Sequence, residues 1–290
     1  MTTLISILLI SALAVLFASA AGGLGAILLG VGRPALATSG STTTTLGGGP
    51  PLLRRAPGIG LAVAFSLLLI ALVVRAVLIG HAPWSTLHEF SLAFAAALLG
   101  THLVLGRTHP LEGLAPFTAL LAVGLVTFSL GLDDSVDPLV PALQQPLLLS
   151  IHVGAAVLAY AVSGVAFVAA AAEIGQARSG DRIPLLPSAA AARAIGHRAV
   201  LIAFPILTIA IALGSVWANL AWRSYWNNDP KELAAAATWL VFGAYLHVAG
   251  RRDRWERLAP WLIVLGFAGV LFTYVGAGLF FIGEHSYAAP

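Results

Sequence analysis

Histidine and aromatic side chains are the groups through which this sequence of 290 residues can do chemistry. It contains eight histidines and no cysteine, so it forms no disulfide and offers no thiolate to a metal or to a substrate. A neutral imidazole ligates metals, including haem iron, and exchanges protons near neutral pH. Three histidines are the strongest candidates for such a role, namely His152, His247 and His285.

The densest group of aromatic residues lies in residues 217–233, which read WANLAWRSYWNNDPKEL. Trp217, Trp222, Tyr225 and Trp226 fall within ten residues of one another. An aromatic belt at a membrane surface explains one or two of them, since Trp and Tyr favour that depth. It explains a dense cluster on one loop less well. A flat aromatic platform at a membrane surface suits a large planar ligand such as a porphyrin.

Several of these polar residues also have a purely structural interpretation. Asp229 is a good N-cap, Pro230 fits the first helical position, and Glu232 completes a capping box, so this stretch can simply start a helix. Any single histidine can equally be satisfied by a neighbouring carbonyl or hydroxyl. The other five histidines are weaker candidates: we expect solvated side chains at His81 and His88, and positions near a membrane boundary for His102, His109 and His197.

The composition places these residues in a membrane protein. Hydrophobic residues make up 59% of the chain and charged residues only 9%, against about 25% charged in soluble proteins. The mean hydropathy of +0.94 agrees. These values exclude a soluble enzyme, a disordered chain and a free nucleic-acid-binding protein. The isoelectric point near 9.7 does not reverse this, because the net charge is only +3.

Apolar segments long enough to cross a bilayer occur about eight times, which predicts an all-α, polytopic membrane helix bundle. The first segment is too long for a signal peptide and lacks a basic region before it, so we keep it as a span. The expected spans are roughly Leu4–Val31, Gly58–Ile79, Glu89–Leu105, Leu111–Leu132, Gln145–Ile174, Ala199–Ala218, Leu233–Ala249 and Leu258–Ile282.

The positions of Lys and Arg predict the orientation. Twelve of the 15 basic residues lie on alternate connections, which the positive-inside rule assigns to the cytoplasm. Both termini are then outside, and so are the aromatic loop, His152 and His285. Arg75 falls near the outer end of its span, where we expect its side chain to snorkel to the surface. Glu89 either opens a helix or belongs to a ligand pocket.

The stretch Ser39–Pro51 is rich in Ser, Thr, Gly and Pro, which is typical of a flexible linker. We therefore predict two units. Residues 1–57 form the first span and a cytoplasmic linker, and residues 58–290 form the functional domain.

Five separated segments of the second unit resemble one family. The aromatic stretch WANLAWRSYWNNDPKE, followed by TWLVFGAYLH, is similar to the tryptophan-rich signature of the CcsA/ResC cytochrome c assembly proteins. The stretches FPILTIAIALGSVWAN, HAPWSTLHEFSLAFA, IHVGAAVLAYA and GEHSYA also fit the family, in the same order and on the same side of the membrane. The resemblance covers roughly residues 58–290.

The resemblance implies a function and a site. It implies a multi-pass protein of the cytoplasmic membrane that receives haem b, carries it outward and positions it for attachment to apocytochrome c. His152 and His285 would ligate the iron on the outer face, and His247 would serve an inner haem site. The aromatic loop would hold the macrocycle, through residues that we take to be Trp217, Trp222, Trp226 and Asp229.

The implied partners are a ResB-like membrane subunit and an apocytochrome c that carries a CxxCH motif, with no role for nucleic acid. Together they would form a lyase-type complex, in which the catalytic residues are unknown. The alternatives are a non-catalytic haem exporter or chaperone, and a structural membrane subunit. The chain departs from the family pattern at Leu220, Arg223 and Asn227–Asn228, where one signature Trp is missing.

Overall fold

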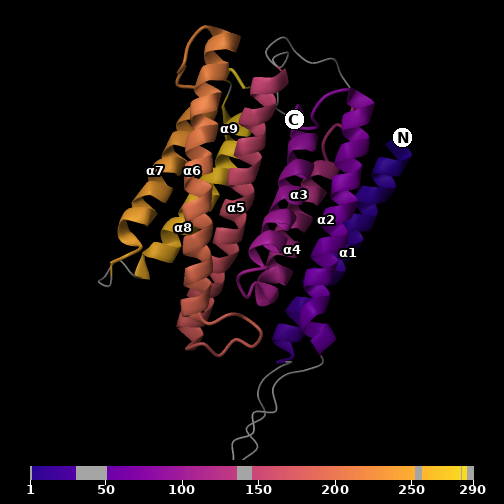
Figure 1. Ribbon diagram of the computed structural model, residues 1–290, viewed down its shortest axis with the longest axis vertical. Coiled ribbons are helices and arrows are strands. Elements are labelled where there is room, and N and C mark those ends of the chain that lie inside the picture. The colour runs from indigo at the N-terminus through magenta and orange to yellow at the C-terminus, as the bar shows by residue number, and fades with distance from the viewer. Residues whose placement is uncertain (1, 31–50, 136–145, 252–256, 282, 286–290) are drawn as a thin grey trace, which may run out of the picture.

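The structure, a computed structural model, describes residues 2–30, 51–135, 146–251, 257–281 and 283–285, and this part of the chain is helical without strands (Figure 1). The all-α prediction is therefore confirmed. The helices are α1 (Thr2–Leu28), α2 (Pro51–Ile79), α3 (Leu87–Leu105), the short 3₁₀ turn η1 (Glu112–Leu114), α4 (Ala115–Leu130), α5 (Pro146–Ser179), α6 (Ala189–Trp222), α7 (Pro230–Val248), α8 (Ala259–Leu271), the π-helical turn η4 (Phe272–Gly276) and α9 (Ala277–Phe280).

The helices run up and down along one long axis, with α1 to α4 on one side and α5 to α9 on the other (Figure 1). The start of α1 and the end of α9 lie at the same end of the bundle, which we call the terminal end. The connections after α3, α5 and α7 lie at the opposite end, which we call the basic end. The described arginines of those connections, Arg107, Arg182, Arg251 and Arg257, therefore lie at one end, as the alternating pattern predicts.

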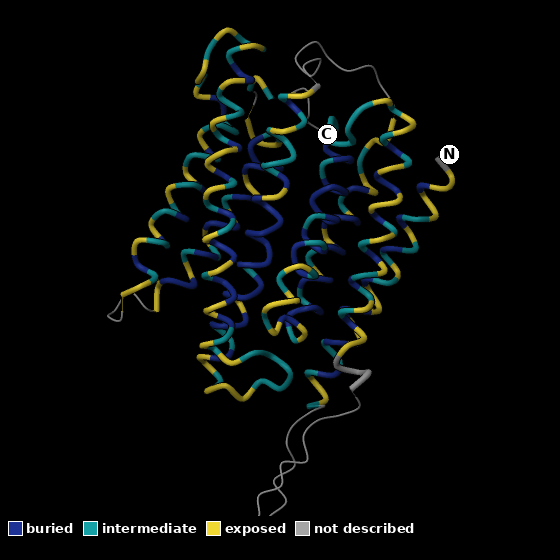
Figure 2. Tube along the Cα trace, in the orientation of Figure 1, coloured by how far each residue is buried: buried dark blue, intermediate teal, exposed yellow. Residues whose placement is uncertain are grey.

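The centre of the bundle is formed by α3 and α5. In their most apolar stretches 72% and 67% of the residues are buried, against 28% to 50% in the other spans. Buried residues follow the faces that the helices turn to one another, and exposed residues follow the outer faces (Figure 2). Since α3 and α5 pack together, they join the two sides of the bundle.

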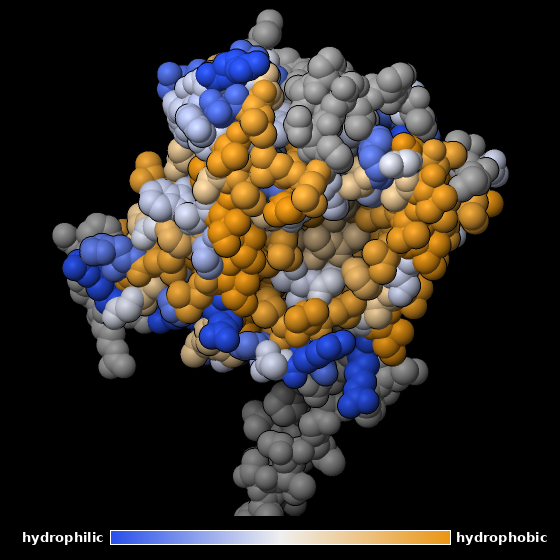
Figure 3. Space-filling view, turned by 45° about the horizontal axis from the view of Figure 1, so that its top comes forward, coloured by the Kyte–Doolittle hydropathy of each residue, from blue (hydrophilic) through white to orange (hydrophobic). Residues whose placement is uncertain are grey.

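Seven helical spans in the described part are long and apolar enough to cross a membrane: α1, α2, α3, α4 with η1, α5, α6, and α8 continued through η4 and α9. Hydrophobic side chains cover much of the flank visible in Figure 3, and hydrophilic ones gather near its ends. The chain is therefore a multi-pass membrane protein. The expected span Leu233–Ala249 corresponds to α7, a helix of 19 residues that is less apolar than the other seven spans.

The first helix packs against the rest of the bundle. Leu9 and Leu16 of α1 belong to the same buried cluster as Leu61 and Leu68 of α2, and α1 also contacts α4. The predicted linker Ser39–Pro51 lies outside the described residues, except for the first residue of α2. Because α2 starts at Pro51, the boundary expected after residue 57 falls inside a helix. The division into two units remains a prediction.

Local sequence explains where the helices around the site begin. The Thr86 hydroxyl accepts a hydrogen bond from the Glu89 backbone at the start of α3. The Ser188 side chain does the same at the start of α6. At the start of α7, Asp229 and Glu232 form the predicted capping box, with Pro230 at the first helical position. These caps fix the ends of three helices without help from the membrane.

Candidate functional site

A cavity of ≈ 200 Å³ lies at the terminal end of the bundle. Its walls come from the segment before α3, from α5, α6 and α7, from the aromatic loop and from η4. Four residues singled out by sequence line it together: His152, His285, Trp217 and Trp226. The two histidines are 133 positions apart in the sequence, so the fold alone brings them to one space.

His152 is held by the backbone of α6. Its Nδ1 lies 2.9 Å from the carbonyl oxygen of Ala210, and because a carbonyl only accepts, Nδ1 carries the proton. In the neutral ring the lone pair is then on Nε2, the atom that can bind a metal. The ring lies parallel to the indole of Trp217, at 10° and with 6.3 Å between centroids. This places His152 in a fixed orientation against an aromatic wall.

Gly214 makes room for this ring. A Cβ at position 214 would lie 2.6 Å from Cε1 of His152 and 3.2 Å from its Nδ1. Any larger residue would therefore displace the imidazole from α6. No feature of the sequence links position 214 to His152, although Gly214 lies in one of the stretches that resemble the family.

His285 is held by a carboxylate. Its Nδ1 donates to Oδ1 of Asp229 at 2.8 Å, and its backbone nitrogen lies 3.4 Å from Oδ2 of the same side chain. Its ring also lies 4.9 Å from Trp222 and 5.8 Å from Trp217. A carboxylate on Nδ1 fixes the tautomer and raises the basicity of Nε2, an arrangement typical of histidines that ligate metals.

Asp229 has two roles at once. It caps α7 by accepting from the Lys231 backbone at 2.8 Å, and it orients His285. Burial alone raises the pKa of Asp229, but the hydrogen bonds from His285 and Lys231 outweigh it and lower this pKa from 3.8 to about 2. Because the pKa of Asp229 is lower in the folded protein than in the unfolded chain, its carboxylate stabilises the fold at pH values above about 4. This contribution is lost as the pH falls from about 4 toward 2. The pair therefore persists at neutral pH.

The aromatic loop divides into buried and exposed members. Trp217 is 1% exposed and Trp222 packs edge-on against it, at 4.7 Å between centroids. Tyr225 and Trp226 are exposed and line the cavity at its surface, and the Trp226 indole donates to Oδ1 of Asn228 at 2.9 Å. Trp222 is not among the lining residues and reaches the site through His285.

Two departures from the family pattern coincide with left-handed backbone. Arg223 closes α6 at φ +62°, and Asn228 precedes Asp229 at φ +56°. Asn tolerates this conformation because its short side chain hydrogen-bonds locally. Arg forms no such local hydrogen bond, so the backbone at position 223 is strained.

Replacing Arg223 with glycine is expected to stabilise the protein. Removing the left-handed strain gains about 1–2 kcal/mol, and the extra freedom of glycine in the unfolded chain offsets about 0.4–1 kcal/mol of it. We expect a higher midpoint of thermal unfolding in detergent for Arg223→Gly. Arg223→Ala is the matched control, because it removes the charge and keeps the strain, so it should give no increase. A lower midpoint for the glycine variant would show that the arginine side chain contributes more than the strain costs.

The third expected ligand is not part of this cavity. His247 is exposed in the last turn of α7, toward the basic end, and does not line the cavity. His88 also differs from expectation, since it is buried rather than solvated and its Nδ1 lies 3.0 Å from the Ser129 carbonyl oxygen. His102 is buried as well, with Nδ1 2.8 Å from the Thr118 hydroxyl. Both are satisfied by neighbours in the bundle core.

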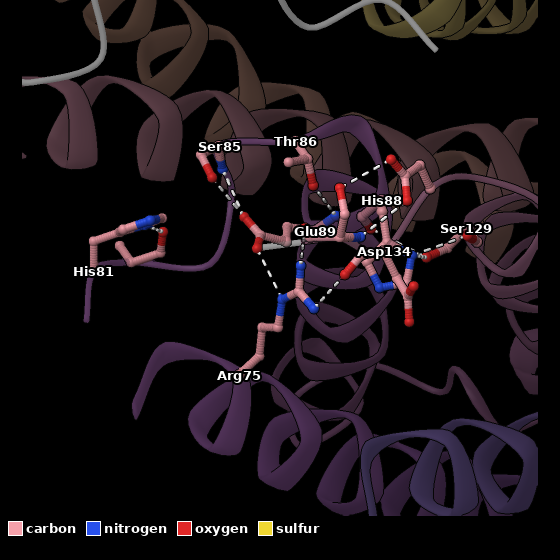
Figure 4. A network of polar contacts seen from close by, with 11 residues as sticks. Arg75, His81, Ser85, Thr86, His88, Glu89, Ser129 and Asp134 are labelled. Atoms are coloured by element: carbon pink, nitrogen blue, oxygen red, sulfur yellow. Dashed lines mark hydrogen bonds and ion pairs between the residues drawn. The ribbon is translucent and has the colours of Figure 1, made fainter. Parts of the chain in front are cut away.

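The prediction that Arg75 snorkels is wrong, because Arg75 is buried at 3% exposure (Figure 4). Its Nε lies 3.0 Å from Oε1 of Glu89, and its other nitrogens donate to the carbonyl oxygens of Asp134 and Ser135 at 2.8 and 3.1 Å. Three hydrogen-bond acceptors at this depth replace the water that a snorkelling guanidinium would reach. The carboxylate supplied by α3 keeps the charge inside.

Glu89 in turn holds the cavity wall. Its Oε2 accepts from both the backbone nitrogen and the hydroxyl of Ser85, at 3.0 and 2.8 Å (Figure 4). Ser85 and Thr86 line the cavity, whereas Glu89 does not. Both earlier interpretations of Glu89 are therefore partly right, because it opens α3 and it supports the pocket from behind.

The sequence analysis did not identify the part of the cavity wall that α5 and η4 supply. Tyr160 of α5 and the η4 residues Thr273 and Tyr274 line it, and the Tyr274 hydroxyl bonds to that of Ser91. A π-helical turn inside a helix is often found at functional sites. Here it places two residues with hydroxyl groups in the wall of a mainly apolar cavity. The apolar run of this span contains no sequence signal for the extra residue in the turn.

These features define a class of protein: a multi-pass membrane helix bundle that brings two oriented histidines and a tryptophan cluster together at one end. The family described as "Cytochrome C assembly protein" matches residues 84–285, and the chain belongs to this family. That range starts at the cavity wall and ends at His285.

Several relatives are similar to this chain over most of their own length. The chain is 37% identical over 247 residues to the cytochrome c biogenesis protein CcsA of Chlamydomonas reinhardtii, covering 80% of this chain and 68% of that protein. It is 33% identical to the CcsA of Synechococcus sp. strain CC9902, covering 78% and 84%. It is 31% identical to that of Microcystis aeruginosa strain NIES-843, covering 82% and 88%. The CcsA proteins are thus the branch of the family to which it belongs.

Proposed function

We propose that this protein is the haem-handling subunit of a cytochrome c synthase. It receives haem b, presents it at the terminal end of the bundle and positions it for covalent attachment to apocytochrome c. One observation carries the proposal: His152 and His285 line one cavity, and each donates its Nδ1 proton to the protein. Their Nε2 atoms would be the ones that hold haem iron.

The rest of the cavity fits the same cargo. Trp217 flanks both imidazoles, and the remaining wall is mainly apolar, as a porphyrin face requires. When haem is bound it supplies two vinyl groups, across which the thiols of a CxxCH motif add to form thioethers. The protein's contribution is to hold the macrocycle in one pose beside the thiols, which is a positioning effect. It needs no cysteine of its own for this.

The membrane arrangement supports a direction of transfer. Arginine-rich connections at the basic end favour a cytoplasmic position for that end, so the cavity would open outside the cytoplasmic membrane. His247 lies nearer the basic end and is exposed on α7. An imidazole on the outside of a bundle is available to a neighbouring subunit, so we propose that His247 serves an inner haem site shared with a ResB-like partner.

Two measurements on the purified protein test the proposal. First, its absorption spectrum should show six-coordinate haem with two histidine ligands. Second, co-expression with the partner and a CxxCH peptide should yield haem that stays on the peptide after denaturation. Bound haem without attachment would instead indicate an exporter or chaperone. Absence of haem would indicate a structural subunit and overturn the proposal.

A further inference from the structure

Lys231 is a cationic residue in the cavity wall, and the proposed ligation of iron by the two histidines gives it no role. It is the second residue of α7, it is half-buried and it lines the cavity. Its Nζ lies 4.0 Å from the position of a Cβ built on Gly278 of α9, so the side chain lies along that short helix. In the described part of the chain its ammonium group has no ion pair or hydrogen bond.

The neighbouring carboxylates are already engaged. Asp229 accepts from His285 and from the α7 backbone. Glu232, the other charged residue that lines the cavity, accepts from the backbone nitrogens of Asn227 and Asp229 at 2.8 and 3.2 Å. Neither carboxylate lies within ion-pair distance of the Lys231 ammonium. Asp229 attracts this charge from a longer distance, but the hydrogen bonds of the ammonium group remain for a ligand.

The surroundings make such a charge costly. Most of the wall is apolar, including Leu149, Val153, Leu207 and Ile211. A cation in an apolar wall is stabilised when an anion pairs with it and accepts its hydrogen bonds. A ligand that fits must therefore combine large apolar faces with an anionic group at one edge.

We propose that Lys231 binds a carboxylate of the ligand in this cavity, which for haem is a propionate. This inference rests on the proposed function and deepens it. The propionates and the vinyl groups lie at opposite edges of the haem macrocycle. A propionate on Lys231 directs the vinyl edge away from the start of α7 and thereby sets which edge is offered to the apocytochrome thiols.

Haem and its dimethyl ester distinguish this contact from the rest of the site. Both carry the same iron and the same apolar faces, but the ester has no carboxylate. We expect the purified full-length protein, stripped of haem, to bind the free acid about tenfold or more tighter than the ester, because a hydrogen bond to a charged group is worth this much. Lys231→Met should reduce the preference to near one, and Lys231→Arg should restore most of it.

Arg223→Met provides the matched control. It removes one positive charge from the same loop, but Arg223 is exposed and does not line the cavity, so the preference should remain. Unchanged binding of the ester by Lys231→Met shows that the cavity is intact in that variant. If ester binding is also lost, Lys231→Gln serves as the test variant.

The outcomes separate the two proposals. If neither porphyrin gives a six-coordinate spectrum, the proposed function fails. If both do, but the wild type binds acid and ester equally, the role of Lys231 is overturned whatever the variants show. A preference that survives in Lys231→Met, with ester binding intact, overturns it as well.

Discussion

Replacing either His152 or His285 with alanine removes the six-coordinate haem spectrum and leaves five-coordinate haem or none. This is the largest effect that the structure predicts for a single side chain. The reason is chemical, since under the proposed function each variant deletes one of the two nitrogens that would hold iron. Added imidazole should restore a six-coordinate spectrum, because it replaces the missing ligand without the chain. Glycine at either position should behave like alanine.

Two other histidines provide controls for this experiment. Nδ1 of His81 donates to the Ala82 carbonyl oxygen within its own connection, and His109 is half-buried and bonds to the Thr108 hydroxyl. Neither lines the cavity. Their alanine variants should therefore leave the spectrum unchanged. A spectrum insensitive to both His152 and His285 would show that the cavity does not ligate iron through this pair.

Loss of the buried pair between Arg75 and Glu89 should destabilise the protein more than loss of any surface charge. Breaking such a pair leaves one charge uncompensated and costs about 3–5 kcal/mol. We expect Arg75→Met and Glu89→Gln each to lower the midpoint of thermal unfolding in detergent, by on the order of 10 °C. The double variant should cost less than the two single variants together, because it leaves no unpaired charge.

Arg107→Met is the matched control for this pair. Arg107 is exposed, so we expect a change within about 0.5 kcal/mol. Glu89→Gln should also weaken haem binding, since one of the two oxygens that accept from Arg75 and Ser85 becomes an amide nitrogen that cannot accept, and the cavity wall loses part of its support. Additive effects of the two substitutions would contradict a direct interaction between the side chains.

The sequence predicted the parts of the site that depend on local patterns. Asp229, Pro230 and Glu232 are close in the chain, so the capping box follows from spacing. The hydrogen bond between Asp229 and His285 does not follow from spacing, because the two residues are 56 positions apart. The structural and functional interpretations of Asp229 are compatible, since a carboxylate has two oxygens and accepts several hydrogen bonds, here from α7 and from His285.

Contacts between distant helices could not be derived in this way. A guanidinium near a span end snorkels when nothing polar lies beside it, and the burial of Arg75 depends on a carboxylate from another helix and on carbonyls about 60 residues away. The close contact between His152 and Gly214 also depends on how two distant helices, α5 and α6, pack together. Hydropathy gives the number and length of helices, but not which faces meet. The polar lining of a membrane cavity is decided by those faces.

The limited apolarity of α7 has a consequence for how the chain enters the membrane. This helix carries Lys231 and Glu232 in its first turn, and charged residues weaken the tendency of a segment to leave the translocation channel for lipid on its own. Its contacts with α8 are close, since a Cβ on Gly266 would meet the ring of Phe242 at 2.5 Å. We therefore expect α7 and α8 to insert together as a hairpin. The aromatic loop and His285 would then reach the far side of the membrane in one step of biosynthesis.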